Sequence, residues 1–350
     1  MTTEKHHLDR DPRLDILRGI GLLCIILAHV GPPSSIFQLR NFDVPLMVLV
    51  SGASFSLSRA QNGKYGQYLF SRFVRLVIPT WIFLAIFFGG TRLWSFIVSC
   101  QYPFSMQKII SSFALLNGIG YVWVIRVFFL VALIAPLAKT VLSSNRRTLL
   151  WLSLIIIYIV YEFSFSYFPW SNFRWVDVLF KEYIFYVVPY GLLMVIGMTL
   201  HQYGPKKQLA GAIILLFIFV CMAKWRHIST GGFVPSQHYK YPPTLYYLSY
   251  AVGMSLLLSS MVEMLNIGSL FIGSILAWIG QRTMWIYLWH IFILYVLSWG
   301  HIKFNFIIMF PVVSAAAISI VVIQGLILKL ILSKFINDGS RKRVTMIFSG

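Results

Sequence analysis

Two residues able to do chemistry lie in the first apolar stretch of the sequence, LDILRGIGLLCIILAHV, with Arg18 near its start and His29 near its end. Eleven residues are three helical turns plus about 20°, so on a helix both side chains share one face, with a rise of about 16 Å between them. Such a pair would line one groove. The alternative is that each marks an ordinary span end, with Arg18 extending to the headgroups and His29 at the opposite interface.

Asp43 follows His29 beyond a turn that contains Gly31, Pro32 and Pro33. A carboxylate that hydrogen-bonds one imidazole nitrogen fixes the tautomer and raises the basicity of the other nitrogen. We therefore expect His29 to act as a general base that Asp43 orients. The place of Asp43 just before Pro45 is also typical of a helix N-cap, and the two roles are compatible.

Three further positions could bind or react. Arg72 and Arg75 lie one helical turn apart in SRFVRLVIP and, with Arg18, could form a cluster that holds phosphates through bidentate hydrogen bonds. The alternative for them is the ordinary enrichment of basic residues in cytoplasmic loops. His290 lies within IYLWHIF, where an uncharged imidazole more often hydrogen-bonds a neighbouring helix than catalyses.

The composition defines the setting of these residues. Of 350 residues, 58% are hydrophobic and 11% are charged, whereas soluble domains carry about 25% charged residues. A soluble globular core is therefore excluded. The net charge is +19, but the basic residues are spread among long apolar runs, so basic loops of a membrane protein are expected and a nucleic-acid partner is not. The three cysteines have no metal-ligand spacing, and no metal is predicted.

The apolar runs predict an all-α integral membrane protein, a bundle of about ten transmembrane helices in the lipid bilayer, since roughly 20 apolar residues cross its core. The expected helices cover residues 14–30, 43–59, 72–90, 121–142, 148–168, 183–201, 208–224, 244–261, 282–299 and 306–333. Residues 106–116 could form an amphipathic or re-entrant helix.

The loop charges predict the orientation. Lys and Arg are more frequent on the side of the N-terminus, which places both termini in the cytoplasm. The expected parts are a cytoplasmic N-terminal tail 1–13, a transmembrane domain 14–333 and a basic cytoplasmic C-terminal tail 334–350. The oligomeric state is left open.

Five sequence elements resemble, in order, those of the acyltransferase-3 family of integral membrane O-acyltransferases. The resemblance is to its branch of fucose O-acetylases and capsule or O-antigen acetyltransferases. The elements are RLDILRGIGLLCIILAH with Arg18 and His29, FDVPLMVLVSGASF with Asp43, Ser51 and Gly52, SRFVRLVIPTW with Arg72 and Arg75, YVWVIRVFFLVALIAPL with Trp123, and LAWIGQRTMWIYLWHIFIL with Tyr287 and His290.

The resemblance implies a function and roles for these residues. The donor would be cytoplasmic acetyl-CoA, and the acceptor a hydroxyl of a cell-surface glycan or its lipid-linked precursor. Arg18, Arg72 and Arg75 would hold the CoA phosphates. His29, oriented by Asp43, would activate the hydroxyl, with an acyl-histidine intermediate as the alternative chemistry. The positions that would serve the oxyanion or the acceptor are Ser51, Trp123, Tyr287 and His290.

The expected location is the cell membrane, as in a bacterial inner or cytoplasmic membrane. An alternative from another class of protein is a multi-pass transporter or flippase of glycan or lipid precursors. In such a protein the intramembrane Arg and His side chains would bind the transported substrate. Acylation with a donor other than acetyl-CoA is a third possibility.

Overall fold

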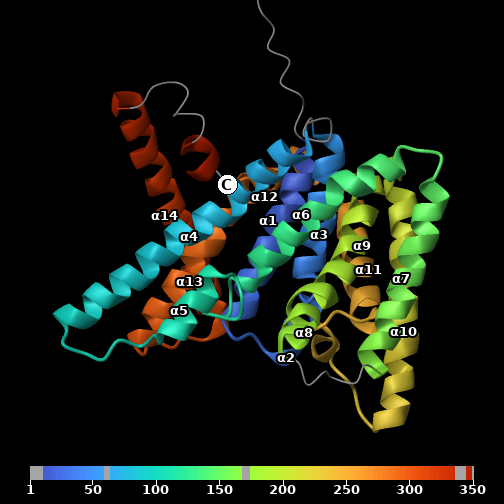
Figure 1. Cartoon of the computed structure of the whole chain (residues 1–350), viewed down its shortest axis with the longest axis horizontal. Helices are drawn as coiled ribbons and strands as arrows, with labels where there is room; N and C mark the ends of the chain where they lie inside the picture. The colour runs from blue at the N-terminus through green and yellow to red at the C-terminus, as the bar shows by residue number, and fades with distance from the viewer. Residues whose placement is uncertain (1–10, 59–63, 168–173, 336–343, 349–350) are drawn as a thin grey trace, which may run out of the picture.

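The computed structural model describes residues 11–58, 64–167, 174–335 and 344–348. These residues form helices and no β-strand (Figure 1). The α-helices are α1 Pro12–His29, α2 Ser34–Leu39, α3 Asp43–Leu57, α4 Tyr65–Ile97, α5 Met106–Phe113, α6 Trp123–Leu142, α7 Arg147–Tyr167, α8 Arg174–Leu179, α9 Phe185–Thr199, α10 Pro205–Thr230, α11 Leu245–Met264, α12 Phe271–Gly280, α13 Thr283–Trp299 and α14 Phe306–Phe335. A π-helical turn, η2 Phe180–Ile184, joins α8 to α9, and short 3₁₀ turns are η3 Leu200–Gln202, η4 Ser236–Tyr239 and η5 Ile267–Ser269.

Among the described residues, 7 helical segments are long and apolar enough to cross a membrane. They are α4, α6, the first 18 residues of α7, residues 176–202, α10, α11 and α14 up to Leu332. The all-helical, multi-pass class is thereby confirmed. The count of about ten spans and the cytoplasmic location of both termini stay predictions.

The structure differs from the expected helices at α4 and at α12. The segment 72–90 is the middle of α4, which has 33 residues. Residues 106–113 form the short helix α5, within the segment 106–116 where an amphipathic or re-entrant helix was considered. Helix α12 was not expected, because its 10 residues are too few to span a bilayer.

Two close helix crossings hold the centre of the molecule together. Helix α1 packs on α12, and a Cβ added to Gly280 would lie 1.8 Å from the carbonyl oxygen of Asp15. Helix α3 packs on α9, where a Cβ added to Gly52 would lie 2.2 Å from the carbonyl oxygen of Met194. Glycine lets helix backbones approach this closely, as is common between membrane helices.

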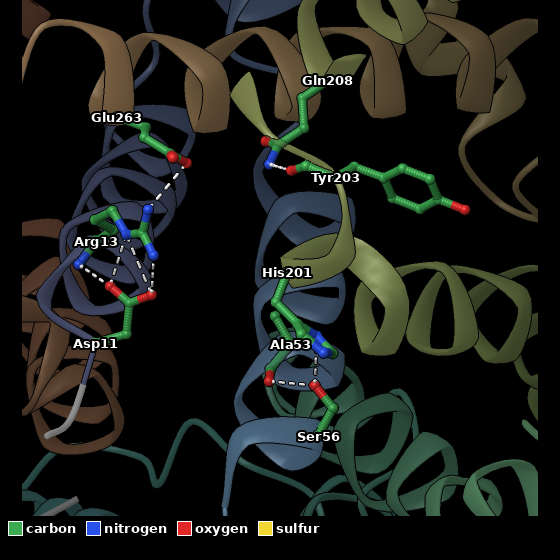
Figure 2. Close-up of polar contacts among 8 residues, drawn as sticks. All are labelled: Asp11, Arg13, Ala53, Ser56, His201, Tyr203, Gln208 and Glu263. Atoms are coloured by element: carbon green, nitrogen blue, oxygen red, sulfur yellow. Dashed lines mark hydrogen bonds and ion pairs between the residues drawn. The ribbon is translucent and has the colours of Figure 1, made fainter. Parts of the chain in front are cut away.

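Polar contacts fix the end of the bundle where α1 begins (Figure 2). Arg13 donates to Asp11 at 2.9 Å and lies 3.0 Å from Glu263 of α11. Ser56, near the end of α3, lies 3.2 Å from the ring of His201 in η3. Helix α1 is therefore tied to α11, and α3 to the end of α9, at the end opposite to His29.

Part of the expected C-terminal tail packs on the bundle. Residues 344–348 are helical, the indole of Trp285 donates to the carbonyl of Ile347 at 3.0 Å, and its ring stacks on Phe348 with centroids 5.2 Å apart. Residues 1–10, 336–343 and 349–350 of the expected tails lie outside the described residues.

Candidate functional site

A cavity of about 250 Å³ lies where α1 ends and α3 begins. Helices α1, α2, α3, α6 and α13 and the short turn η4 line it, together with the loops before α3, before α6 and before α11. The lining residues are Ile25, Ala28, His29, Phe37, Arg40, Asp43, Val44, Tyr121, Trp123, Val124, Gln237, Lys240, Tyr241 and Tyr287. Four predicted site residues, His29, Asp43, Trp123 and Tyr287, therefore meet in one cavity.

The local sequence explains why His29 and Asp43 meet. Helix α1 ends at His29, and Gly31 follows with a φ of +69°, a conformation that glycine adopts readily. Pro32 and Pro33 then start the short helix α2, which leads back to α3 at Asp43. The C-terminal end of one helix is thus placed beside the N-terminal end of the next.

His29 is held by another histidine. Its Nδ1 lies 3.0 Å from Nε2 of His290, and the two rings are nearly parallel, with an angle of 8° and centroids 5.3 Å apart. Tyr121 packs edge-on against the His29 ring at a centroid distance of 4.8 Å. His290 is fully buried and does not line the cavity, so it supports His29 from behind.

The hydrogen bonds define the tautomers of this pair. Nδ1 of His290 contacts the carbonyl oxygen of Tyr287, and because a carbonyl only accepts, this nitrogen carries the hydrogen. In a neutral ring, Nε2 of His290 is then an acceptor, so Nδ1 of His29 donates to it. This leaves a lone pair on Nε2 of His29, as a general base requires.

Asp43 does not make the expected hydrogen bond to His29. Its Oδ2 accepts from Nη1 of Arg40 at 2.6 Å, and its Oδ1 accepts from Nζ of Lys240 at 2.9 Å and from the backbone N–H of Val44 at 2.8 Å. Two cations and a helix N-terminus therefore satisfy the carboxylate. The residue in hydrogen-bond contact with His29 is His290 instead, so the orienting role predicted for Asp43 falls to His290 in this geometry.

Burial shifts the pKa values in the loop before α11. Desolvation lowers the pKa of Lys240 below its usual value, and the charge of Arg40 acts in the same direction, while Asp43 opposes both. Desolvation also raises the pKa of the Tyr241 phenol, and the nearby Asp43 raises it further. The Tyr241 hydroxyl is therefore neutral, and Lys240 depends on Asp43 to keep its charge.

The other predicted oxyanion or acceptor residues differ in their placement. Tyr287 donates its hydroxyl hydrogen to the carbonyl of Tyr121 at 2.6 Å, so its oxygen is left as an acceptor. Ser51 donates to the carbonyl of Met47 at 2.8 Å within α3 and does not line the cavity. Trp123 packs edge-on against Tyr241 at 5.3 Å and presents the one indole N–H among the described lining residues.

The three predicted phosphate-binding arginines lie outside the cavity and have different neighbours. Arg18 donates to Asp15 at 2.6 Å and to Ser54 at 2.5 Å. Arg72 lies over the Tyr68 ring at 5.1 Å, and Arg75 is exposed. In Figure 1 the N-terminal halves of α1 and α4, which carry these residues, lie toward the same end of the molecule. Their joint action on phosphates stays a prediction.

Sequence reasoning did not single out Arg40 and Lys240 as site residues. Both are almost fully buried, at 5% and 2% exposure. Arg40 precedes Asp43 by three residues, across the turn that joins α2 to α3, and this short separation of opposite charges could have indicated the contact. Lys240 lies 197 positions after Asp43 in the sequence. In the sequence only the tyrosines on either side of it, Tyr239 and Tyr241, distinguish it from other lysines in loops. Among the described residues, no group of three His, Cys, Asp or Glu side chains could hold a metal ion.

Fold and site together define a multi-pass membrane protein in which a histidine, hydrogen-bonded to a second, buried histidine, lines a cavity. The acyltransferase-3 family model, described as an acyltransferase domain, matches residues 11–328, so the chain belongs to this family of membrane acyltransferases. Comparison with curated proteins and with solved structures gives no match.

Proposed function

We propose that the protein is a membrane O-acetyltransferase. It moves an acetyl group from cytoplasmic acetyl-CoA to a hydroxyl of a cell-surface polysaccharide or its lipid-linked precursor, as in the fucose, capsule or O-antigen branch of the family, in the bacterial inner or cytoplasmic membrane. The observation that carries the proposal is the position of His29, which lines the cavity while its Nδ1 is hydrogen-bonded to His290, an arrangement that leaves the lone pair on Nε2. The transporter alternative is set aside, because the family match is to an acyltransferase.

The reaction follows from the two histidines. Nε2 of His29 takes the proton from the acceptor hydroxyl as the hydroxyl oxygen attacks the thioester carbonyl. The tetrahedral oxyanion then collapses, the bond to sulfur breaks, and the CoA thiolate takes the proton back from His29. In the alternative mechanism, acetyl-CoA first acetylates His29, and the acetyl group then passes from His29 to the acceptor hydroxyl, with the same products.

The oxyanion needs hydrogen-bond donors that do not have to reorganise. Of the predicted candidates, the indole N–H of Trp123 is suited to this role because it lines the cavity with His29. Tyr287 is less suited, since its hydroxyl hydrogen is already donated to Tyr121. Ser51 would have to leave its bond to Met47 and lies away from the cavity.

The donor would reach His29 along α1. Arg18 lies near the start of this helix and His29 at its end, with a rise of about 16 Å between them. An arginine at the cytoplasmic end suits the phosphates of CoA, and the pantetheine arm would run between the two residues. Arg72 and Arg75 are proposed to contribute further phosphate contacts.

The mass of the surface glycan tests the proposal. Cells that carry the gene should make a glycan heavier by one acetyl group than cells without it. An unchanged mass with altered export of the glycan would contradict the acetyltransferase and favour a transporter.

A further inference from the structure

The cavity carries more positive charge than the proposed reaction uses. Asp43 is the one carboxylate among the described residues that line it, and its two oxygens already pair with Arg40 at 2.6 Å and Lys240 at 2.9 Å. Two cations against one anion leave a single positive charge in excess. Burying such a charge without a counter-charge is costly, so this cluster is suited to an anion that enters the cavity.

The two cations also have hydrogen bonds to spare. Nε of Arg40 is buried and has no hydrogen-bond partner among the described residues. Of the three N–H bonds of the Lys240 ammonium group, one is used by Asp43. Oε1 of Gln237, on the same wall, is a buried acceptor without a partner. The unused donors match the oxygens of an acid, and the unused acceptor matches a hydroxyl.

The rest of the wall suits a saccharide. Tyr121, Trp123, Tyr241 and Tyr287 surround the cavity with aromatic rings, the usual lining of pockets for small organic molecules. The volume of about 250 Å³ is below the roughly 300–1,000 Å³ of pockets for drug-sized ligands. The cavity is therefore suited to a ligand smaller than a drug-sized molecule, such as a single sugar unit.

We propose that the acceptor is an acidic saccharide, whose anionic group pairs with Arg40 and Lys240 while one hydroxyl faces His29. The inference deepens the proposed function and rests on it for the role of the hydroxyl. The recognised chemistry is an anionic oxygen acid on the acceptor. It could be a carboxylate of the sugar or a phosphate of a lipid-linked precursor, and the experiment separates the two.

Binding is measured apart from transfer, on the full-length protein in detergent. Its thermal unfolding is followed with methyl glucuronide and methyl galacturonide, with glucose 1-phosphate and galactose 1-phosphate, and with the neutral methyl glucoside and galactoside. At least one anionic saccharide should raise Tm, and no neutral one should. A carboxylate that stabilises indicates the sugar acid as source, and a sugar phosphate indicates the lipid-linked precursor. Equal effects of neutral and anionic saccharides, or no effect of any anionic one, would overturn the inference.

Two variants test the cluster itself. Lys240→Met removes the excess charge and should weaken binding of the anionic saccharide at least tenfold. Lys303→Met removes an exposed lysine outside the cavity and should change nothing. If Lys240→Met binds the anionic saccharide as the unmodified protein does, the inference is wrong.

Acetyl transfer from acetyl-CoA to the same saccharides distinguishes the two proposals. Transfer to neutral saccharides at the rate of anionic ones would overturn this inference and leave the acetyltransferase standing. Specific binding of anionic saccharides with no transfer to any saccharide would leave the anion site standing and contradict the acetyltransferase. If Lys240→Met lowers kcat equally for neutral and anionic saccharides and leaves their binding unchanged, Lys240 stabilises the oxyanion of the reaction and the inference is wrong.

Discussion

His29 and His290 are joined by a hydrogen bond of 3.0 Å between Nδ1 and Nε2, across 261 positions of sequence. Because His290 in turn contacts the carbonyl of Tyr287, the pair forms a short chain of hydrogen bonds that ends at a backbone acceptor. The chain leaves the lone pair of His29 on Nε2, and the His29 side chain lines the cavity. It also links the end of α1 to the middle of α13, two helices that pack against each other.

His290→Ala should lower kcat about 10²-fold or more, because His29 loses the acceptor that fixes its tautomer. His290→Gln should recover part of the loss, since its amide oxygen can accept from Nδ1 of His29. The measurement is kcat and KM for acetyl transfer by the purified protein, with His201→Ala, remote from the cavity, as a control. Equal kcat values for the Ala and Gln variants would show that His290 only fills space.

Asp43→Asn should lower stability, because it leaves two buried cations without a carboxylate, and loss of one partner of a buried pair costs about 3–5 kcal/mol. The double variant Asp43→Asn with Lys240→Met should be more stable than Asp43→Asn alone, since it removes one of the unpaired charges. Thermal unfolding of the single and double variants in detergent checks this. Additive losses of stability would mean that the two side chains do not interact.

Gly52→Ala and Gly280→Ala should each destabilise the fold by about 1–3 kcal/mol or more, because the added methyl group meets a backbone oxygen of the adjoining helix. Gly89→Ala is the matched control. A Cβ at Gly89 meets nothing within 4 Å, so alanine is expected to be neutral or slightly stabilising in α4. Similar Tm values for all three variants would contradict the close packing of α1 on α12 and of α3 on α9.

Arg18→Ala should raise KM for acetyl-CoA at least tenfold with a smaller change in the KM of the acceptor, because Arg18 is assigned to the donor phosphates. Arg72→Ala and Arg75→Ala should act in the same direction. Lys303→Ala provides the control. A selective rise in the acceptor KM for Arg18→Ala would place the donor elsewhere.

The sequence was sufficient to predict the helical membrane class and the acyltransferase family, while the catalytic role of His29 stays a prediction. Apolar runs long enough to cross a bilayer are a local property, and so is the spacing of Arg18 and His29 on one helix. The partner of His29 could not be predicted, because it depends on how α1 packs against α13. The same holds for Lys240, whose burial depends on the path of the loop before α11. Helix α12 was not predicted, because it is too short to be recognised as a membrane-spanning segment.

The central claim is that His29 is the base in acetyl transfer, and His29→Ala tests it most directly. The variant is expressed in cells that lack the native gene, and its insertion in the membrane is verified. The mass of the surface glycan is then measured by mass spectrometry. The account predicts a glycan without the acetyl group that the unmodified protein adds. A glycan acetylated to the normal extent by the inserted His29→Ala protein would contradict it.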